Sequence, residues 1–271
     1  MRNWEPDHRW AGKRASAFTL VELLVTLATI GILAGLLGAA IIYGREKAKV
    51  TRCTNNFRQL GIAANLYATE GKGGLFPSPM LRTATSGLTN YDSIDPAWVD
   101  FAMITELDAH GVTPEMYFCP ARRRWRVAVD FYRWKSVGKS IQTSADLISY
   151  YQLQGAAMAF LDMFWWVPRP LEGLGEMKFP DPEFLETRIQ EPWPSKSEDP
   201  SAAIQPIASD WLLGGWDNVR RAVTSASGGH TFRSKIRSNN ALFSDGHVET
   251  RPFATVRWQL LNHRKDAAYL Y

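Results

Sequence analysis

The chain has 271 residues, a formal net charge of +4 and a sequence isoelectric point near 9.1. Its charged residues are spread along the sequence, apart from Arg122-Arg123-Arg124 and the helix face from Arg45 to Arg58, so we do not expect nucleic acid as a partner. Neither of its two cysteines belongs to a Cys-x-x-Cys motif, so the spacing gives no reason to expect a zinc or redox site, and we predict no cofactor.

Residues 1–17 are polar, and the basic pair Lys13-Arg14 directly precedes an apolar stretch. Residues 18–42 carry a single charge, on Glu22. About 25 apolar residues, rising ~1.5 Å each in a helix, are enough to cross a hydrocarbon layer of about 30 Å. A charge inside such a segment is costly, so Glu22 either has a function or lies close enough to the cytoplasmic interface to reach water. We predict a leader over 1–17 and a membrane-spanning helix over 18–42.

The helix is expected to continue through residues 43–70, which contain no proline and many good helix formers. Apolar side chains recur there at spacings of three and four, which places them on one face that can pack on a folded domain. Glycines at 71, 73 and 74 end the pattern. The apolar residues of this face are Val50, Cys53, Phe57, Leu60, Ala64 and Tyr67.

Residues 71–271 are expected to form an α+β domain. A short helix is predicted within 96–109, and the apolar run at 203–211 is typical of a central strand. Residues 148–161 fit either a buried strand pair or a short helix, because periodicity does not separate the two.

Two apolar runs flank Asp245-Gly246 near the end of the chain. Asp-Gly is the strongest short signal for a hairpin, because a type I′ turn needs positive φ at both central residues. The predicted hairpin motif comprises Asn240, Asp245, Gly246 and His247.

The sequence from Ala17 to Glu22 reads Ala-Phe-Thr-Leu-Val-Glu and opens the apolar stretch. It resembles the processing and methylation site of type IV prepilins and type II secretion pseudopilins. The resemblance implies that prepilin peptidase cuts between Ala17 and Phe18 and methylates the new amino group of Phe18. It also implies that Glu22 meets the Phe18 amino group of a neighbouring subunit during assembly. Ala17 departs from the family, which usually has glycine there.

The same resemblance implies a pilin-like fold, in which a long N-terminal helix packs its second half on a small antiparallel sheet. The implied function is a structural, non-enzymatic subunit of a type II secretion or type IV pilus-like fibre. The protein would be a single-pass protein of the inner membrane with its C-terminal domain outside the cytoplasm. The implied partners are prepilin peptidase, other pilin-like subunits and membrane lipid.

A second resemblance joins three distant segments. Residues 53–61 read Cys-Thr-Asn-Asn-Phe-Arg-Gln-Leu-Gly, Cys119 precedes a proline, and Asn240 begins Asn-Ala-Leu-Phe-Ser-Asp-Gly-His-Val. These segments resemble pseudopilin-like proteins with a so-called H-X9-DG domain. Here His230 precedes Asp245 by fifteen positions instead of ten, and Lys235 stands at the nominal place of the family's histidine. Either five residues are inserted between His230 and Asp245, or the family's histidine is lost.

Cys53 and Cys119 form an even pair in a domain expected outside the cytoplasm, where a disulfide can persist. Such a bridge would close a loop of about 65 residues and stabilise the fold by roughly 4 kcal/mol in the chain-entropy model. The alternative is two unpaired, partly buried thiols. Both readings remain open at the level of the sequence.

A metal or acid–base site is a further hypothesis, because two histidines and two carboxylates lie in the last third of the chain. The turn itself accounts for two of them, Asp245 and His247, so no metal is assigned. Two other functions stay open: an anchored extracytoplasmic domain that binds a ligand or envelope polymer through its tryptophans, and a metallohydrolase. The four candidate residues are Asp210, His230, Asp245 and His247.

Overall fold

The computed structural model describes residues 18–70, 73–78, 96–122, 141–167, 169–170, 178–179, 193–215, 228–232, 235–256, 258–261 and 267–270. The chain divides into two compact units, Met1–Arg45 and Glu46–Tyr271. Helix and antiparallel strands are both present, so the predicted α+β class with a long N-terminal helix is confirmed. Ala17 lies outside the described residues.

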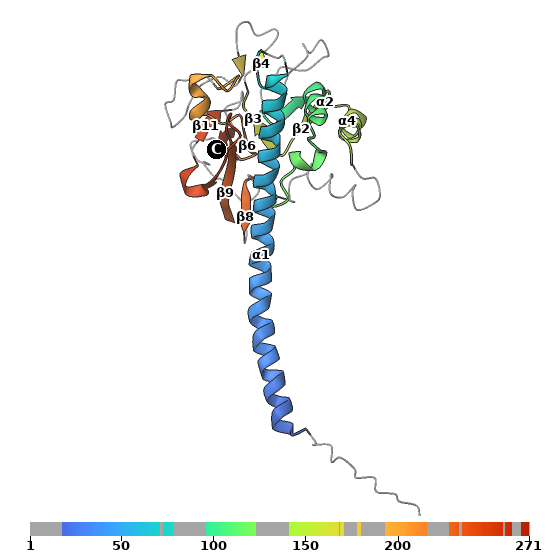
Figure 1. Ribbon diagram of the computed structural model, residues 1–271, viewed down its shortest axis with the longest axis vertical. Helices are drawn as coiled ribbons and strands as arrows, with labels where there is room; N and C mark the ends of the chain where they lie inside the picture. Colours follow the sequence, from blue (N-terminus) through green and yellow to red (C-terminus); the bar gives the residue numbers. More distant parts are fainter. Residues whose placement is uncertain are drawn as a thin grey trace, which may run out of the picture. The chain divides into compact units, whose positions relative to one another are not determined.

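Helix α1 runs without interruption from Leu20–Thr69, as the sequence predicted (Figure 1). Thr19 and Glu22 begin it with a reciprocal capping box. The Glu22 amide donates to Thr19 Oγ1 at 3.2 Å, and the Thr19 amide donates to Glu22 Oε2 at 2.9 Å. This Thr-x-x-Glu signal satisfies backbone groups that the first helical turn leaves without a partner.

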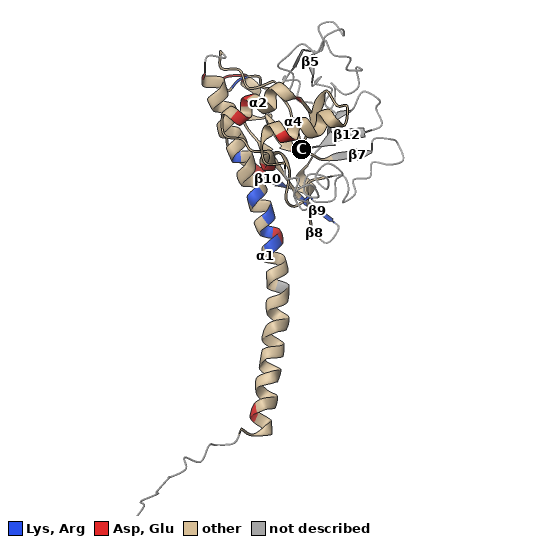
Figure 2. Ribbon diagram, turned by 90° about the vertical axis from the view of Figure 1, so that its right-hand side faces the viewer, with Lys and Arg blue, Asp and Glu red and all other residues tan. Residues whose placement is uncertain are grey.

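The first part of α1 presents apolar side chains all around its axis. Every large apolar side chain over residues 18–42 is between 44% and 77% exposed, and Figure 2 shows this stretch as tan apart from one acidic position near its start. The helix is long and apolar enough to cross a membrane. A stretch that is hydrophobic on every side needs apolar surroundings on every side.

The second part of α1 belongs to the second unit and buries one face in its core. Cys53, Phe57, Leu60 and Ala64 are each at most 2% exposed, which confirms the predicted apolar face. At Gly61 the helix passes close to the C-terminal hairpin, because a Cβ there would lie 3.3 Å from the Cα of Gly246.

Among the described residues of the second unit, five antiparallel strands form the main sheet. Strand β9 pairs with β10 along one edge, and β8 and β6 pair with successive parts of its other edge, while β3 extends the sheet beyond β6. The predicted central strand within 203–211 is therefore confirmed as β6. The strands are β3 (Met163–Trp165), β6 (Ala208–Asp210), β8 (His230–Phe232), β9 (Lys235–Leu242) and β10 (Val248–Pro252).

Smaller elements surround this sheet. Helix α2 (Phe101–Ala109) lies within the range predicted for a short helix, and the ambiguous range 148–161 holds the end of helix α4 (Ser144–Leu153) followed by strand β2. The 3-10 helices are η1 (Pro114–Tyr117), η2 (Pro200–Ala203) and η3 (Phe253–Thr255). The remaining strands are β1 (Trp98–Asp100) paired with β2 (Met158–Phe160), β4 (Arg169–Pro170) with β5 (Lys178–Phe179), and β7 (Leu213–Gly215) with β12 (Ala267–Leu270) and β11 (Trp258–Leu261).

The C-terminal hairpin is confirmed, but the predicted type I′ turn is wrong. The Gly246 amide donates to the Phe243 carbonyl and the Phe243 amide donates to the His247 carbonyl, each at 3.0 Å. Ser244 and Asp245 are therefore the central residues, and Gly246 follows them at φ +85°. A three-residue loop of this kind uses glycine for the left-handed position after the turn, not for the turn's centre.

The core of the second unit forms where α1, α2 and α4 meet the strands β2, β3 and β6. Among the tryptophans whose side chains the structure describes, Trp98 is half-buried and the other four are buried. The Trp165 indole donates to the Pro77 carbonyl at 2.8 Å, and the Trp166 indole donates to Ser209 Oγ at 2.9 Å. These rings therefore hold the core together. The four buried tryptophans are Trp165, Trp166, Trp193 and Trp211.

Candidate functional site

The strand register beyond β6 brings an aspartate and a histidine face to face. Leu212 pairs with Gly228 in an antiparallel bridge. This bridge brings the chain just after β6, which ends at Asp210, next to the chain just before β8, which begins at His230. The two side chains meet accordingly, with His230 Nε2 3.2 Å from Asp210 Oδ2.

Two glycines allow this close approach. Gly228 has φ +118°, and a Cβ on it would collide with the Trp211 carbonyl; Gly229 has φ +62° and donates its amide to that same carbonyl at 3.1 Å. Any other residue at Gly228 would have to push the strand away from Trp211. The glycines therefore set the position from which His230 enters the core.

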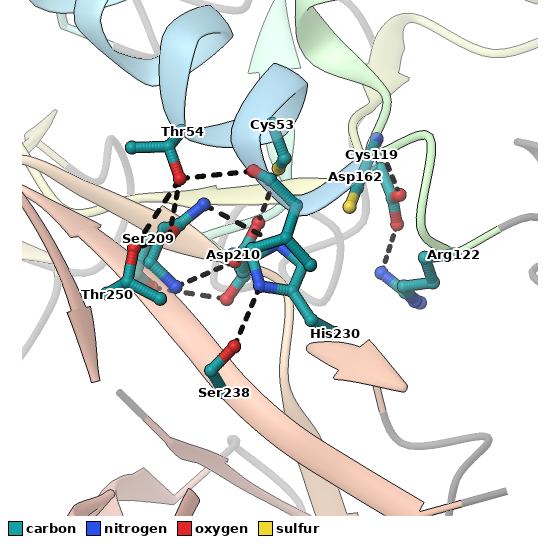
Figure 3. A network of polar contacts seen from close by, with 12 residues as sticks. Cys53, Thr54, Cys119, Arg122, Asp162, Ser209, Asp210, His230, Ser238 and Thr250 are labelled. Atoms are coloured by element: carbon teal, nitrogen blue, oxygen red, sulfur yellow. Dashed lines mark hydrogen bonds and ion pairs between the residues drawn. The ribbon is translucent and has the colours of Figure 1, made fainter. Parts of the chain in front are cut away.

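Two cysteines from other parts of the chain complete the group. Cys53 projects from α1, and Cys119 follows η1. Figure 3 shows both sulfur atoms beside Asp210 and His230, and one ligand atom from each of the four residues lies within 4.8 Å of all the others. We call Cys53, Cys119, Asp210 and His230 the dithiol cluster. All four side chains are buried, at 5% exposure or less.

Hydrogen bonds orient the members of the dithiol cluster. Cys53 Sγ donates to Asp210 Oδ1 at 3.3 Å, and the Asn240 amide donates to Asp210 Oδ2 at 2.7 Å. The other ring nitrogen of His230, Nδ1, lies 3.1 Å from Ser238 Oγ. The imidazole therefore turns Nε2 toward the centre and is held from behind through Nδ1 (Figure 3).

A buried ion pair adjoins the dithiol cluster. The Arg122 guanidinium pairs with Asp162, and the other oxygen of Asp162 accepts from the Cys119 amide at 3.0 Å. The guanidinium also lies over the Trp211 ring, 3.9 Å from its centroid. Burial raises the pKa of Asp162 to about 8 against the opposing charge of Arg122, and burial lowers the pKa of Arg122. Asp162 thereby fixes the backbone from which Cys119 projects.

The thiols and the imidazole influence one another strongly. The hydrogen bond to Cys119 and burial both raise the pKa of Cys53. Burial also raises the pKa of Cys119, but the hydrogen bond from Cys53 and the charge of His230 outweigh it and lower that pKa below its ordinary value. Burial lowers the pKa of His230, yet the charges of Asp210 and Cys119 prevail and raise it to about 9. The donor set favours a thiolate on Cys119.

The structure brings together some of the residues singled out in the sequence and separates others. Cys53 and Cys119 meet, as a disulfide would require, but both thiols are free. Asp210 and His230 meet these cysteines, whereas Asp245 and His247 pair with each other at the exposed turn. The four-residue site weighed in the sequence is therefore replaced by a different group of four.

The hairpin motif reaches the dithiol cluster through Asn240. Its side-chain oxygen accepts from Thr250 at 2.8 Å and lies 3.4 Å from Thr54 Oγ1 on α1, while its backbone amide holds Asp210. Asn240 therefore ties the sheet to the helix beside the dithiol cluster. At the other end of the chain, Phe18 is exposed just before α1, and Glu22 lies in its first turn.

Sequence reasoning missed two features. No role was assigned from the sequence to the glycines at 228 and 229, although positive φ and contact with Trp211 require them. The dithiol cluster as a group of four was also missed, because its residues come from segments far apart in the chain and no short spacing connects them. The sequence indicated its two halves separately, Cys53 with Cys119 as a possible disulfide and Asp210 with His230 as part of a metal-site hypothesis.

Comparison with known proteins leaves the family open. No protein-family model matches the chain, and no curated protein or solved structure matches it. What the chain does must therefore be argued from its own residues.

Proposed function

We propose that this protein is a pilin-like structural subunit, anchored in the inner membrane by the first part of α1 and assembled from there into a fibre. One observation carries the proposal. A single helix, Leu20–Thr69, exposes apolar side chains on all sides over its first part and contributes its second part to a folded core. Such a helix anchors the domain and can also pack against copies of itself.

The apolar part has the dimensions for this role. Residues 18–42 would extend about 37 Å at ~1.5 Å per residue, enough to cross about 30 Å of hydrocarbon with some tilt. The first basic residue after it is Arg45, and three more cations follow, at 47, 49 and 52. Cations at the end of a membrane helix suit the lipid headgroup layer. The residues at 46–69 then lie outside the hydrocarbon.

The role of Glu22 distinguishes a fibre subunit from a protein that is only anchored in the membrane. Its carboxylate accepts from the amide and hydroxyl of Thr19, at 2.9 and 2.8 Å, and so caps its own helix. These bonds leave it a full negative charge in lipid, which costs at least ~2.5–3.5 kcal/mol. In the proposed fibre, the amino group that processing creates on Phe18 of a neighbouring subunit neutralises that charge.

The tryptophans that the structure describes serve the core and give no support to a binding surface. The alternative of an anchored domain that binds envelope polymers relies on tryptophans at the surface. Of those whose side chains the structure describes, all but the half-buried Trp98 lie inside the core. We therefore keep the non-polymerising anchor only as an outcome of the experiment.

Processing and assembly can be tested on the full-length protein in membranes. In cells with an active prepilin peptidase, mass spectrometry of the purified protein should find a mature chain that begins at Phe18 with a methylated amino group. Cells without the peptidase are the control, and should yield a chain that still carries residues 1–17. A chain beginning at Met1 in both strains would overturn the proposal.

Amine-reactive crosslinking in the same membranes tests polymerisation. A subunit should give a ladder of multimers that requires the peptidase. A processed chain that remains monomeric at matched expression would favour the anchored-domain alternative instead.

A further inference from the structure

We propose that the dithiol cluster binds one zinc ion, which fastens the second part of α1 to the C-terminal sheet. This inference does not depend on the proposed function, because every ligand lies within the unit Glu46–Tyr271. The ligand atoms are the sulfurs of Cys53 and Cys119, Nε2 of His230 and a carboxylate oxygen of Asp210.

The geometry suits a tetrahedral ion. Zinc binds sulfur at about 2.3 Å and nitrogen or oxygen at about 2.0–2.2 Å, which places the ligand atoms of a tetrahedron about 3.3–3.8 Å apart. Two distances already lie close to this range: His230 Nε2 is 3.2 Å from Asp210 Oδ2, and Cys53 Sγ is 3.3 Å from the other carboxylate oxygen, Oδ1. All four atoms lie within 4.8 Å of one another, so small rotamer adjustments close the site.

The ligand types select the metal. Two thiolates exclude calcium and magnesium, which take oxygen ligands, and sulfur with imidazole in four-coordinate geometry is typical of zinc. Four protein ligands, all buried, leave no position for a water or a substrate. A closed site of this kind is structural, whereas hydrolytic zinc sites keep one position open. The dithiol cluster therefore argues against the metallohydrolase reading of His230 as well.

Neighbouring groups hold the ligands as metal sites require. Metal-binding histidines donate their second ring nitrogen to a fixed acceptor, and Ser238 Oγ stands 3.1 Å from Nδ1 of His230. The Asn240 amide holds Asp210 at 2.7 Å, and Asp162 holds the Cys119 amide at 3.0 Å. Three of the four ligands are thus oriented from the surrounding core.

The charge around the site suits the ion as well. Two thiolates and one carboxylate carry three negative charges against the two positive charges of zinc. The buried Arg122 guanidinium acts electrostatically on both Cys119 and Asp210 and supplies a further positive charge nearby.

A disulfide is the competing use of the same sulfur atoms. It would involve Cys53 and Cys119 alone and would give no reason for a histidine and an aspartate to be buried against them. Zinc uses all four groups and joins four elements that are far apart in the chain: α1, the segment after η1, β6 and β8. We therefore favour the metal.

The test uses full-length protein purified in detergent without chelators. Elemental analysis should find one zinc per chain, and cobalt substituted for zinc should show the sulfur-to-cobalt charge-transfer band and the intense visible bands of a tetrahedral thiolate site. Cys53→Ser and His230→Ala should lose the metal. Asp245→Asn and His247→Ala are matched controls from the exposed turn and should keep it.

A further variant keeps the test informative if the ligand variants fail to fold. Ser238→Ala leaves all ligands in place but removes the support of His230, and it should weaken zinc affinity about 10–100-fold. Chelation of the wild type should lower its melting temperature, and added zinc should restore it.

Three results would overturn the proposal. The first is wild-type protein with two titratable thiols that takes up neither zinc nor cobalt. The second is a Cys53–Cys119 disulfide, seen as thiols that react with alkylating reagents only after reduction. The third is equal metal content in the Cys53→Ser variant and the Asp245→Asn control.

Discussion

Glu22 carries two roles that substitutions can separate. In the isolated subunit its carboxylate caps α1 through Thr19. In the proposed fibre its charge meets the Phe18 amino group of a neighbour. Glu22→Gln keeps a capping side chain, since glutamine also serves in a capping box, but removes the charge. Thr19→Ala removes the capping hydroxyl but keeps the charge of Glu22. Glu22→Ala removes both the capping side chain and the charge.

The free energy expected from capping and the free energy expected from charge pairing differ enough for these variants to be told apart. Loss of an N-terminal cap costs about 0.5–2 kcal/mol, which affects only the first turn of a 50-residue helix. Neutralising a carboxylate in lipid recovers at least ~2.5–3.5 kcal/mol, or about 60–300-fold in the equilibrium between subunit and fibre. A glutamine has no charge for the neighbouring amino group to neutralise, so the Glu22→Gln variant should lose this shift in the equilibrium between subunit and fibre. We expect Thr19→Ala to assemble, and Glu22→Gln and Glu22→Ala to fail alike.

The assay is crosslinking in cells that express each variant at the level of the wild type, with cleavage after Ala17 confirmed by mass spectrometry. Fully processed Glu22→Gln protein that forms multimers as the wild type does would refute the charge-pairing argument. If Thr19→Ala fails together with Glu22→Ala while Glu22→Gln assembles, the cap alone explains the role of Glu22.

Three predictions concern the folded domain and can be checked by thermal melts of the full-length protein. Gly246→Val should destabilise it by about 1–3 kcal/mol, because Gly246 holds φ +85° after the hairpin turn. Gly61→Ala should also destabilise it, because the added methyl would lie 2.7 Å from the side chain of Leu242, the buried residue that ends β9. Overpacking costs about 1–3 kcal/mol, which exceeds the gain in helix propensity of up to about 1 kcal/mol. A Gly61→Ala protein more stable than the wild type would show that the space between Gly61 and this side chain can hold a methyl group. His110 should stabilise the domain below pH ~6.5 and lose that contribution as pH rises through its raised pKa, because the Glu106 carbonyl and then Glu70 favour the charged imidazole. A positive charge at the C-terminal end of α2 is worth about 0.3–1 kcal/mol, and His110→Gln should remove this part of the pH dependence; an unchanged pH profile would contradict the assignment.

The local features of the chain could be predicted because their causes are local. The length of the apolar stretch, the three-and-four spacing from Cys53 to Ala64 and the Asp-Gly dipeptide each constrain a few neighbouring residues. Helix α1 and the β9–β10 hairpin follow from them. The turn type did not, since glycine fits both a type I′ turn and the position after a type I turn, and only the pairing of Phe243 with His247 decides between them.

The candidate site depended on contacts that no local pattern records. Cys53 faces the core by helical periodicity, but its neighbours Cys119, Asp210 and His230 are brought to it by the packing of α1 on the sheet and by the register of two strands. The sequence by itself determined that this protein has a long, initially apolar helix, an α+β domain and a C-terminal hairpin. Only the tertiary structure decided which cysteines, aspartate and histidine share one buried space, because side chains distant in the chain meet only when the strands pair and the core closes.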